Sequence, residues 1–113
     1  MTRGDVVLVD WPYSDRTGSK LRPAVVVQAD YLNGLIDDTV LAQITSKAHG
    51  IPGTEVTLDP IQEPGSGLLQ VSYVFCPNLM TAEQAMIDQT IGALSDQAMR
   101  LIDACLKSTL GIP

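Results

Sequence analysis

The chain has 113 residues, of which 45% are hydrophobic and 18% charged, and its formal net charge is −6. This composition excludes a disordered chain, and the length suits one domain because two halves would bury only poor cores. The acidic balance excludes a protein that binds nucleic acid over its whole surface, since phosphate contacts need clustered Lys and Arg. Five of the seven cationic side chains precede residue 48, so any RNA-binding surface is expected in the first half. We expect a single domain over residues 1–113.

The sequence gives no sign of export or of membrane insertion. No apolar run approaches the roughly 20 residues of a membrane-spanning helix, and the first five residues lead directly into a strand pattern without the apolar region of a signal peptide. We therefore expect a cytoplasmic protein. Cys76 and Cys105 can pair in principle, but two cysteines in such a chain are better interpreted as buried thiols.

The first two strands are predicted from short β-branched runs. Residues 6–9 form the first run, which ends at a Trp-Pro pair, and residues 23–28 form the second. Ser, Asp, Gly and Thr are frequent in residues 13–20, as expected for an exposed loop. Because Pro23 is tolerated only at the beginning or edge of a strand, Arg22 is expected where the loop becomes the strand.

Three further strands are predicted in the middle of the chain. Residues 39–45 and 54–58 have the patterns of strands, and residues 70–76 are expected to form a fifth. Residues 32–38 have no clear period and are compatible with one helical turn. Loops rich in Gly and Pro separate the later strands.

The chain ends in its clearest helix. Residues 86–94 are expected to form a strand, after which Ser95 is a suitable N-cap and Asp96 lies favourably at the positive helix end. Apolar side chains then recur at helical spacing until Gly111, namely Ala98, Leu101, Ile102, Cys105, Leu106 and Leu110. This helix is expected to pack on the sheet, the alternative being a partner-binding helix. Short strands with one terminal helix predict a mainly β fold, a small antiparallel sheet closing into a barrel.

The common catalytic and cofactor motifs are absent from the sequence. It has no glycine-rich phosphate loop, no His and Cys at metal-binding spacing and no nucleophile elbow, so we expect no metal ion and no cofactor. His49 is the only histidine. Its neighbours are typical of a plain loop, which favours an exposed side chain over a role in acid-base catalysis.

Five landmarks follow one another along the chain in an informative order. They are Arg3-Gly4-Asp5-Val6-Val7-Leu8-Val9-Asp10, then Gly18-Ser19 with Lys20-Leu21-Arg22-Pro23-Ala24-Val25-Val26-Val27-Gln28, then Ile44-Thr45-Ser46, then Gly67-Leu68 with Leu79-Met80-Thr81, and finally Ile91-Gly92-Ala93-Leu94-Ser95. In this order and spacing they resemble the MazF/PemK family of type II toxin–antitoxin endoribonuclease toxins. The resemblance spans essentially the whole chain.

The resemblance implies a fold, an activity and partners. The fold is an SH3-like antiparallel barrel of the MazF/CcdB type with a C-terminal helix, usually assembled as a homodimer. The activity is metal-independent, sequence-specific cleavage of single-stranded RNA or mRNA. In it the ribose 2′-hydroxyl attacks the adjacent phosphate and leaves 2′,3′-cyclic phosphate and 5′-hydroxyl ends. A cognate antitoxin is the expected protein partner.

The resemblance also implies catalytic residues. Arg22 matches the family's catalytic arginine, and a planar guanidinium can bind two phosphate oxygens together. Thr45 falls on the family's Thr/Ser position after the third strand, and Ser46 is an adjacent substitute. The alternatives are a surface ion pair for Arg22 and a turn hydroxyl for Thr45.

Candidate RNA contacts lie near these residues. Ser19 and Lys20 are expected in an exposed loop beside Arg22, and Lys47 follows the third strand. Trp11 can stack on a base, although packing in the core is the favoured interpretation of a sole Trp.

Three positions depart from the family's pattern. Phe75 stands where many members carry a basic residue, Pro77 where some carry an acidic one, and Ala93 where Arg is frequent. Neither Phe75 nor Pro77 can bind phosphate through its side chain or transfer a proton. For Phe75, packing in the core is favoured over stacking on a base.

Two other functions remain open at this point. One is a non-enzymatic binding module on the same barrel, such as a gyrase poison, which the terminal Leu110-Gly111-Ile112-Pro113 weakly suggests. The other is a degenerate toxin that serves as an antitoxin-binding scaffold, which the departures at Phe75 and Pro77 suggest.

Overall fold

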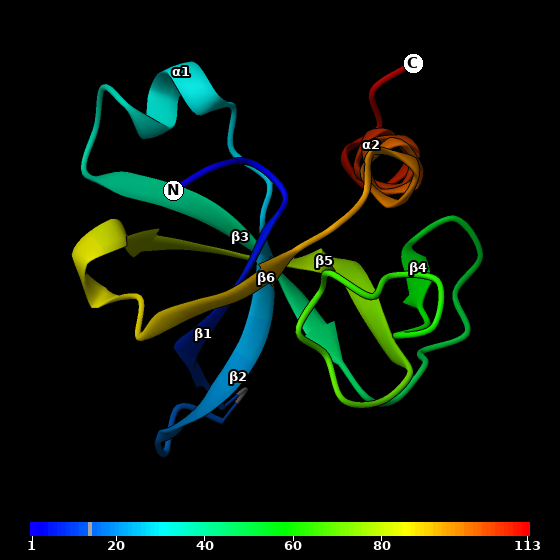
Figure 1. Cartoon of the computed structure of the whole chain (residues 1–113), viewed down its shortest axis with the longest axis horizontal. Coiled ribbons are helices and arrows are strands. Elements are labelled where there is room, and N and C mark those ends of the chain that lie inside the picture. The colour runs from blue at the N-terminus through cyan, green and yellow to red at the C-terminus, as the bar shows by residue number, and fades with distance from the viewer. Residues whose placement is uncertain (14) are drawn as a thin grey trace.

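The computed structural model describes residues 1–13 and 15–113 and consists of a curled antiparallel sheet with a C-terminal helix (Figure 1). Its six strands are ordered β4-β5-β3-β2-β1-β6. In chain order the elements are β1 (Asp5–Pro12), β2 (Ser19–Val26), α1 (Asp30–Asn33), β3 (Asp38–Thr45), β4 (Glu55–Leu58), β5 (Ser72–Glu83), the 3₁₀ turn η1 (Gln84–Met86), β6 (Gln89–Ala93) and α2 (Asp96–Leu110). The predicted mainly β fold is confirmed. Within the described residues, no helix has the length and apolar character needed to cross a membrane.

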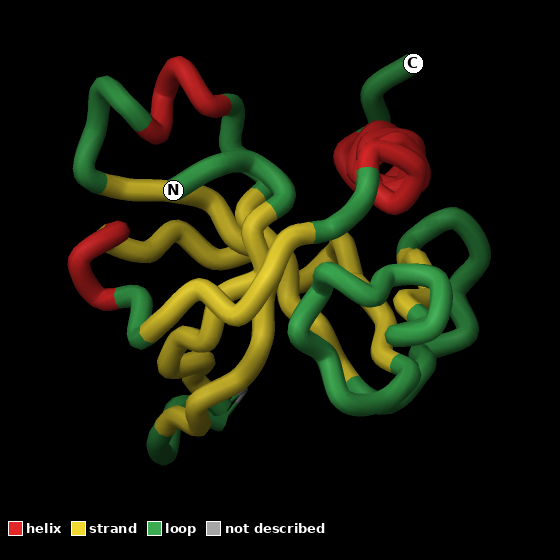
Figure 2. Tube along the Cα trace, in the orientation of Figure 1, coloured by secondary structure: helices red, strands yellow, loops and turns green. Residues whose placement is uncertain are grey.

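The central strands are buried on both faces of the sheet. Val6 and Val7 are adjacent in β1 and both fully buried, although their side chains point to opposite faces. Val6 belongs to a core cluster that includes Ile102 of α2, whereas Val7 belongs to a second cluster around Trp11 and Leu41. Burial on both faces explains why apolar residues are continuous along these strands instead of alternating with polar ones. Figure 2 shows the strands gathered at the centre with the helices at the periphery.

Strand β5 is longer than the sequence predicts. The fifth strand is expected over residues 70–76, but β5 continues past Pro77 to Glu83. The pairing of β3 with β5 shifts at this point, because the adjacent residues Ala42 and Gln43 pair with Leu79 and Phe75. Residues 76–78 therefore form a bulge in which Pro77 needs no ladder hydrogen bond, so a proline is tolerated inside the strand.

Strand β2 begins earlier than expected. Ser19 and Lys20, which were expected in a loop, pair with Pro12 and Trp11 of β1. Pro23 consequently lies inside β2 rather than at its start. This is tolerated because β3 pairs with β2 only from Ala24 onward, so residues 19–23 have edge-strand character on that side.

Helix α2 packs on the sheet as the sequence predicts. Its buried residues Ala98, Met99 and Ile102 join the first core cluster, against β4 and β5. Gly111 ends the helix with φ 70°, a left-handed conformation that glycine adopts without a steric penalty. Leu101, expected on the apolar face, is 54% exposed.

The predicted N-cap of α2 is confirmed and is tied to the loop before β5. The Ser95 hydroxyl oxygen accepts the Ala98 N–H at 3.2 Å and its O–H donates to Glu63 at 2.6 Å. We expect Ser95→Ala to lower the free energy of unfolding by about 1 kcal/mol, the usual cost of losing a cap. Ser95→Thr keeps the hydroxyl and should therefore retain most of the stability that the cap provides. Urea unfolding checks both, and equal stability of Ser95→Ala and the unsubstituted chain would contradict the capping role.

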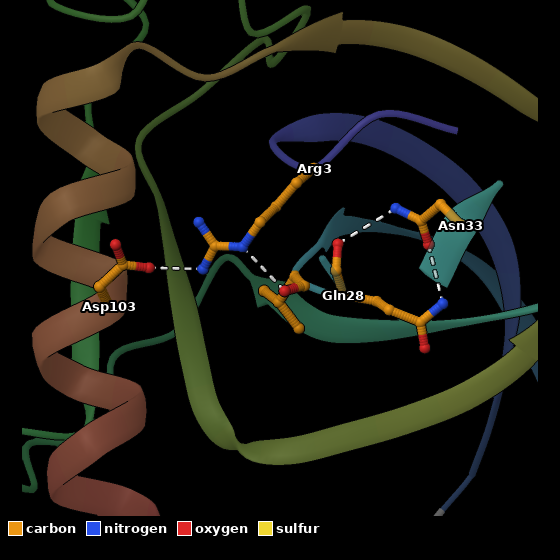
Figure 3. A network of polar contacts seen from close by, with 5 residues as sticks. Arg3, Gln28, Asn33 and Asp103 are labelled. Atoms are coloured by element: carbon orange, nitrogen blue, oxygen red, sulfur yellow. Dashed lines mark hydrogen bonds and ion pairs between the residues drawn. The ribbon is translucent and has the colours of Figure 1, made fainter. Parts of the chain in front are cut away.

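A polar network connects the N-terminal segment to both helices (Figure 3). The Arg3 guanidinium forms an ion pair with Asp103 of α2 and donates from Nε to the Val27 carbonyl at 2.9 Å. Beside it, the Gln28 amide donates to Asn33 Oδ1 at 2.9 Å, and this oxygen also accepts the hydroxyl of buried Thr39 at 2.7 Å. These bonds satisfy the polar groups that α1 and the start of β3 bury.

Both cysteines are free thiols: Cys76 is buried, as predicted, whereas Cys105 is only partly buried. Burial raises the pKa of Cys76 from 9.0 to about 12. Between pH 9 and 12 the folded chain therefore keeps the Cys76 proton, whereas the unfolded chain loses it. The contribution of this thiol to the free energy of unfolding is complete below pH 9 and declines as the pH rises from 9 to 12. We expect the free energy of unfolding to fall less steeply over this range in Cys76→Ala. Parallel slopes in urea unfolding series would contradict this.

Candidate functional site

The site lies where strands β2 and β3 separate. Their pairing begins at Ala24 and Gln43, and the strands diverge on the side of Arg22 and Thr45. Extending the antiparallel register by two residues would set Arg22 opposite Thr45, with both side chains on the face of Ala24. The two residues therefore flank the split between the strands.

A cleft of about 840 Å³ opens at this split. Residues from β1, β2, β3, β5 and the loops after β1 and β3 line it: Trp11, Pro12, Tyr13, Asp15, Arg16, Arg22, Gln43, Thr45, Ser46, Lys47, His49, Asn78, Leu79 and Met80. The structure thus brings together Arg22, Thr45, Ser46, Lys47 and Trp11 from the residues proposed in the sequence analysis.

Arg22 is half-buried in the cleft wall. Within residues 1–13 and 15–113, its guanidinium forms no ion pair and no hydrogen bond. The surface ion pair that was the alternative interpretation of Arg22 is not formed with these residues. Because none of the described residues occupies its N–H donors, the guanidinium can bind an anion in the cleft.

The hydroxyl of Thr45 is oriented by the turn that follows β3. Its Oγ1 accepts the Lys47 N–H at 3.3 Å. A hydroxyl that accepts one hydrogen bond still has its own O–H to donate, so Thr45 retains a donor for a ligand. Ser46 and Lys47 are exposed at the mouth of the cleft.

The cleft is locally positive in an acidic protein. Arg16, Arg22 and Lys47 contribute three cations, against one carboxylate from Asp15. The Thr17 backbone N–H and hydroxyl bind Asp15 Oδ1 at 3.0 and 2.8 Å, and these hydrogen bonds lower the pKa of the carboxyl. This charge distribution agrees with the expectation that any RNA-binding surface is local.

The other predicted RNA contacts lie at different depths. Trp11 is 4% exposed and packs in the second core cluster, and the small part of it that reaches the surface contributes to the cleft. Ser19 and Lys20 are exposed on β2 and do not line the cleft. They are the first two residues of β2, next to the loop that follows β1.

Gln43, Asn78 and Arg16 are among the cleft residues that the sequence did not single out as parts of a site. Gln43 and Asn78 lie on neighbouring strands, where the Asn78 amide donates to Gln43 Oε1 at 2.9 Å. Arg16 lies in the loop after β1 with a positive φ of 61°, which is uncommon for a residue other than glycine. Only the bulge in β5 brings Asn78 beside Gln43, so sequence spacing carried no signal for this pair.

His49 is exposed in the loop after β3, as its neighbours in the sequence predict. Its ring lines the cleft and stacks on the ring of Phe75, with centroids 3.7 Å apart and planes inclined by 8°. Its loop is fixed because the Glu55 carboxylate accepts the backbone N–H groups of His49 and Gly50 at 3.0 and 2.9 Å. These bonds lower the pKa of Glu55, the His49 N–H most strongly. Phe75 is only half-buried and belongs to neither core cluster, so the prediction of core packing is wrong.

The cleft has the chemistry of an anion site. Guanidinium and ammonium groups bind phosphate oxygens through charge-assisted hydrogen bonds, and hydroxyl groups add neutral donors. No group of three His, Cys, Asp or Glu residues in the described part of the chain is arranged to hold a metal ion. Pro77, exposed in the β5 bulge, and Ala93, exposed in β6, contribute no polar side chain.

The fold is similar to those of solved toxin structures. An endoribonuclease in complex with its cognate antitoxin from a mycobacterial species superposes with a TM-score of 0.82 at 24% identity, covering 100% of this chain and 97% of that chain. The Mycobacterium tuberculosis toxin MazF-mt6 gives 0.78 at 20% identity, covering 96% and 98%. A MazE–MazF structure from Deinococcus radiodurans gives 0.77 at 22% identity, covering 100% and 98%.

A family model matches almost the whole sequence. The model describes PemK-like, MazF-like toxins of type II toxin–antitoxin systems, and the match extends over residues 2–110. The landmarks that suggested this family lie in the matched range. The chain therefore belongs to the PemK-like, MazF-like toxins of type II toxin–antitoxin systems.

Proposed function

We propose that this toxin is a metal-independent, sequence-specific endoribonuclease and that residues 1–113 form its single toxin domain. It cleaves single-stranded RNA, including mRNA, to 2′,3′-cyclic phosphate and 5′-hydroxyl ends. The observation that carries the proposal is the meeting of Arg22 and Thr45 in one locally positive cleft. Family membership and structural neighbours that are endoribonucleases also support it.

The cleft residues suit the demands of this reaction. Attack of the 2′-hydroxyl on phosphorus develops negative charge on the phosphorane oxygens. The Arg22 guanidinium, which has no partner among the described residues, is suited to stabilise this charge. The Thr45 hydroxyl, with Ser46 beside it, supplies further donors to the same phosphate. The nucleophile belongs to the substrate, so the reaction needs no metal-activated water.

RNA binding is assigned to the residues around this centre. Lys47 neutralises a neighbouring phosphate at the mouth of the cleft, and Lys20 with Ser19 contacts the RNA backbone at the start of β2. Trp11, largely buried, contributes an edge or face to a base at the cleft floor. These contacts hold the strand so that one phosphate lies against Arg22.

The proposed partners follow from the type of system. The protein acts in the cytoplasm as a homodimer and is neutralised by a cognate antitoxin. Similar structures of an endoribonuclease with its cognate antitoxin and of MazE–MazF support the antitoxin as partner.

The test is incubation of purified protein with a long RNA of mixed sequence in EDTA, followed by mapping of the ends. We expect cleavage at a small set of sequences, with 5′-hydroxyl ends that polynucleotide kinase labels without prior phosphatase treatment. Dependence of cleavage on added Mg²⁺ or 5′-phosphate ends would contradict the proposal. Absence of cleavage together with tight antitoxin binding would favour a scaffold, and inhibition of DNA supercoiling would favour a gyrase poison.

A further inference from the structure

Cleavage of RNA by its own 2′-hydroxyl requires a proton for the departing 5′-oxygen. Without one, the leaving group is an alkoxide, which is very basic and departs slowly. Arg22 is poorly suited to this task because a guanidinium in a protein stays protonated throughout. Thr45 and Ser46 carry hydroxyl groups that hold their protons at neutral pH. The phosphate-binding residues of the cleft thus leave the proton donor unassigned.

Among the side chains that line the described part of the cleft, one is of a type that can donate a proton near neutral pH. Lysine and tyrosine side chains ordinarily titrate near pH 10, and the pKa of the Asp15 carboxyl is lowered by its bonds to Thr17. Histidine is the side chain that ordinarily exchanges its proton between about pH 5 and 8. His49 is therefore the lining residue suited to donate a proton near neutral pH.

The geometry of His49 is that of a held ring rather than a loose loop side chain. Stacking on Phe75 fixes the plane of the imidazole, and the Glu55 carboxylate fixes the backbone on either side through His49 and Gly50. Neither ring nitrogen has a hydrogen-bond partner within residues 1–13 and 15–113, so both nitrogens are available to a ligand. Phe75 supports the ring from β5 without competing for its protons.

The charged and titratable groups around His49 come from each neighbouring element. Glu55 lies on β4, and its carboxylate accepts the backbone N–H groups of His49 and Gly50. Lys47 lies on the loop itself, Arg22 on β2, and Arg16 with Asp15 and Tyr13 on the loop after β1. A phosphate bound between these cations would lie in the same cleft as the His49 ring.

We propose that the imidazole of His49, stacked on Phe75, is the general acid that protonates the departing 5′-oxygen; this rests on the proposed function. The 2′-oxygen forms a bond to phosphorus as the bond from phosphorus to the 5′-oxygen breaks. The 5′-oxygen takes a proton from the His49 imidazolium, and the proton of the 2′-hydroxyl passes to water. Water later returns a proton to His49, so no proton is gained or lost overall.

The experiment compares two variants on two substrates. His49→Gln removes the ring, whereas His49→Phe keeps a ring that can stack but carries no proton. One substrate is a short RNA with a mapped cleavage site, and the other has sulfur in place of the bridging 5′-oxygen at that site. A thiolate departs without a proton, so the sulfur substrate needs no general acid.

We expect both variants to cleave the ordinary RNA about 10²-fold or more slowly, the usual contribution of a positioned acid. Both should cleave the sulfur substrate nearly as fast as the unsubstituted chain. The decline in rate that accompanies loss of the imidazolium proton as pH rises should be absent from both. Because His49 is exposed, both variants should keep the unfolding free energy of the unsubstituted chain, which urea unfolding checks.

Several results would overturn the assignment. Full activity of His49→Phe on ordinary RNA would show that the ring acts by stacking, and equal losses on both substrates would show a role in binding or positioning. If His49→Gln cleaves RNA at the normal rate while cleavage still depends on Arg22, the role of His49 as the acid is rejected and the proposed function is kept. Absence of cleavage by the unsubstituted chain would reject the proposed function and this inference with it.

Discussion

Replacing Arg22 by Ala is expected to lower the rate of RNA cleavage by about 10²- to 10³-fold, the usual cost of removing one oriented donor to a developing oxyanion. The guanidinium lies half-buried in the cleft and has no partner among the described residues, so its removal breaks no internal hydrogen bond or ion pair. The fold should therefore be preserved. The measurement is the single-turnover rate on an RNA with a mapped cleavage site, alongside urea unfolding.

Two further variants test whether the loss of rate is specific to the guanidinium of Arg22. Arg22→Lys keeps the charge but loses the planar fork, so we expect it to recover only part of the lost rate. Arg100→Ala removes an exposed cation from α2 that does not line the cleft, and it should leave the rate unchanged. An Arg22→Ala protein that cleaves at the normal rate in EDTA would reject the assigned role of Arg22.

Replacing Gly92 by Ala is expected to destabilise the fold by about 3 kcal/mol, at the upper end of the usual range for overpacking. A Cβ at this position would lie 2.2 Å from the Gly65 carbonyl oxygen and 2.5 Å from the Ser66 carbonyl carbon. Both atoms are backbone, and the Gly65 carbonyl also accepts the Ala93 N–H at 2.9 Å. The loop before β5 therefore cannot move away without breaking its attachment to β6.

The matched control is Gly34→Ala. Gly34 has φ −87° in the right-handed helical region, and an added Cβ would meet neighbouring atoms only at 3.8 Å. We expect this variant to be as stable as the unsubstituted chain or slightly more stable. Thermal unfolding should give a Tm lower by roughly 10 °C for Gly92→Ala alone. Similar Tm values for the two variants would contradict the close packing of the loop on β6.

The sequence by itself determined the fold class, the family and the C-terminal helix. β-branched runs between loop signals predicted the strands, because side chains that favour the extended backbone and bury well are concentrated there. Ser95 and Gly111 marked the ends of α2 because capping depends on local hydrogen bonds and backbone angles. Arg22 and Thr45 were singled out by the family's landmarks rather than by their own chemistry.

Tertiary structure alone decided how far the strands extend and what lies beside the cleft. Strand β5 extends past Pro77 because a bulge relieves the proline of its ladder hydrogen bond, which a local sequence signal cannot show. Ser19 and Lys20 were read as loop because their strand character comes from pairing with β1. His49 and Phe75 are 26 residues apart in the sequence, and their rings meet because β5 pairs with both β3 and β4, the strands on either side of the His49 loop. Local propensity governs short-range structure, whereas pairing between distant segments positions the side chains of the site.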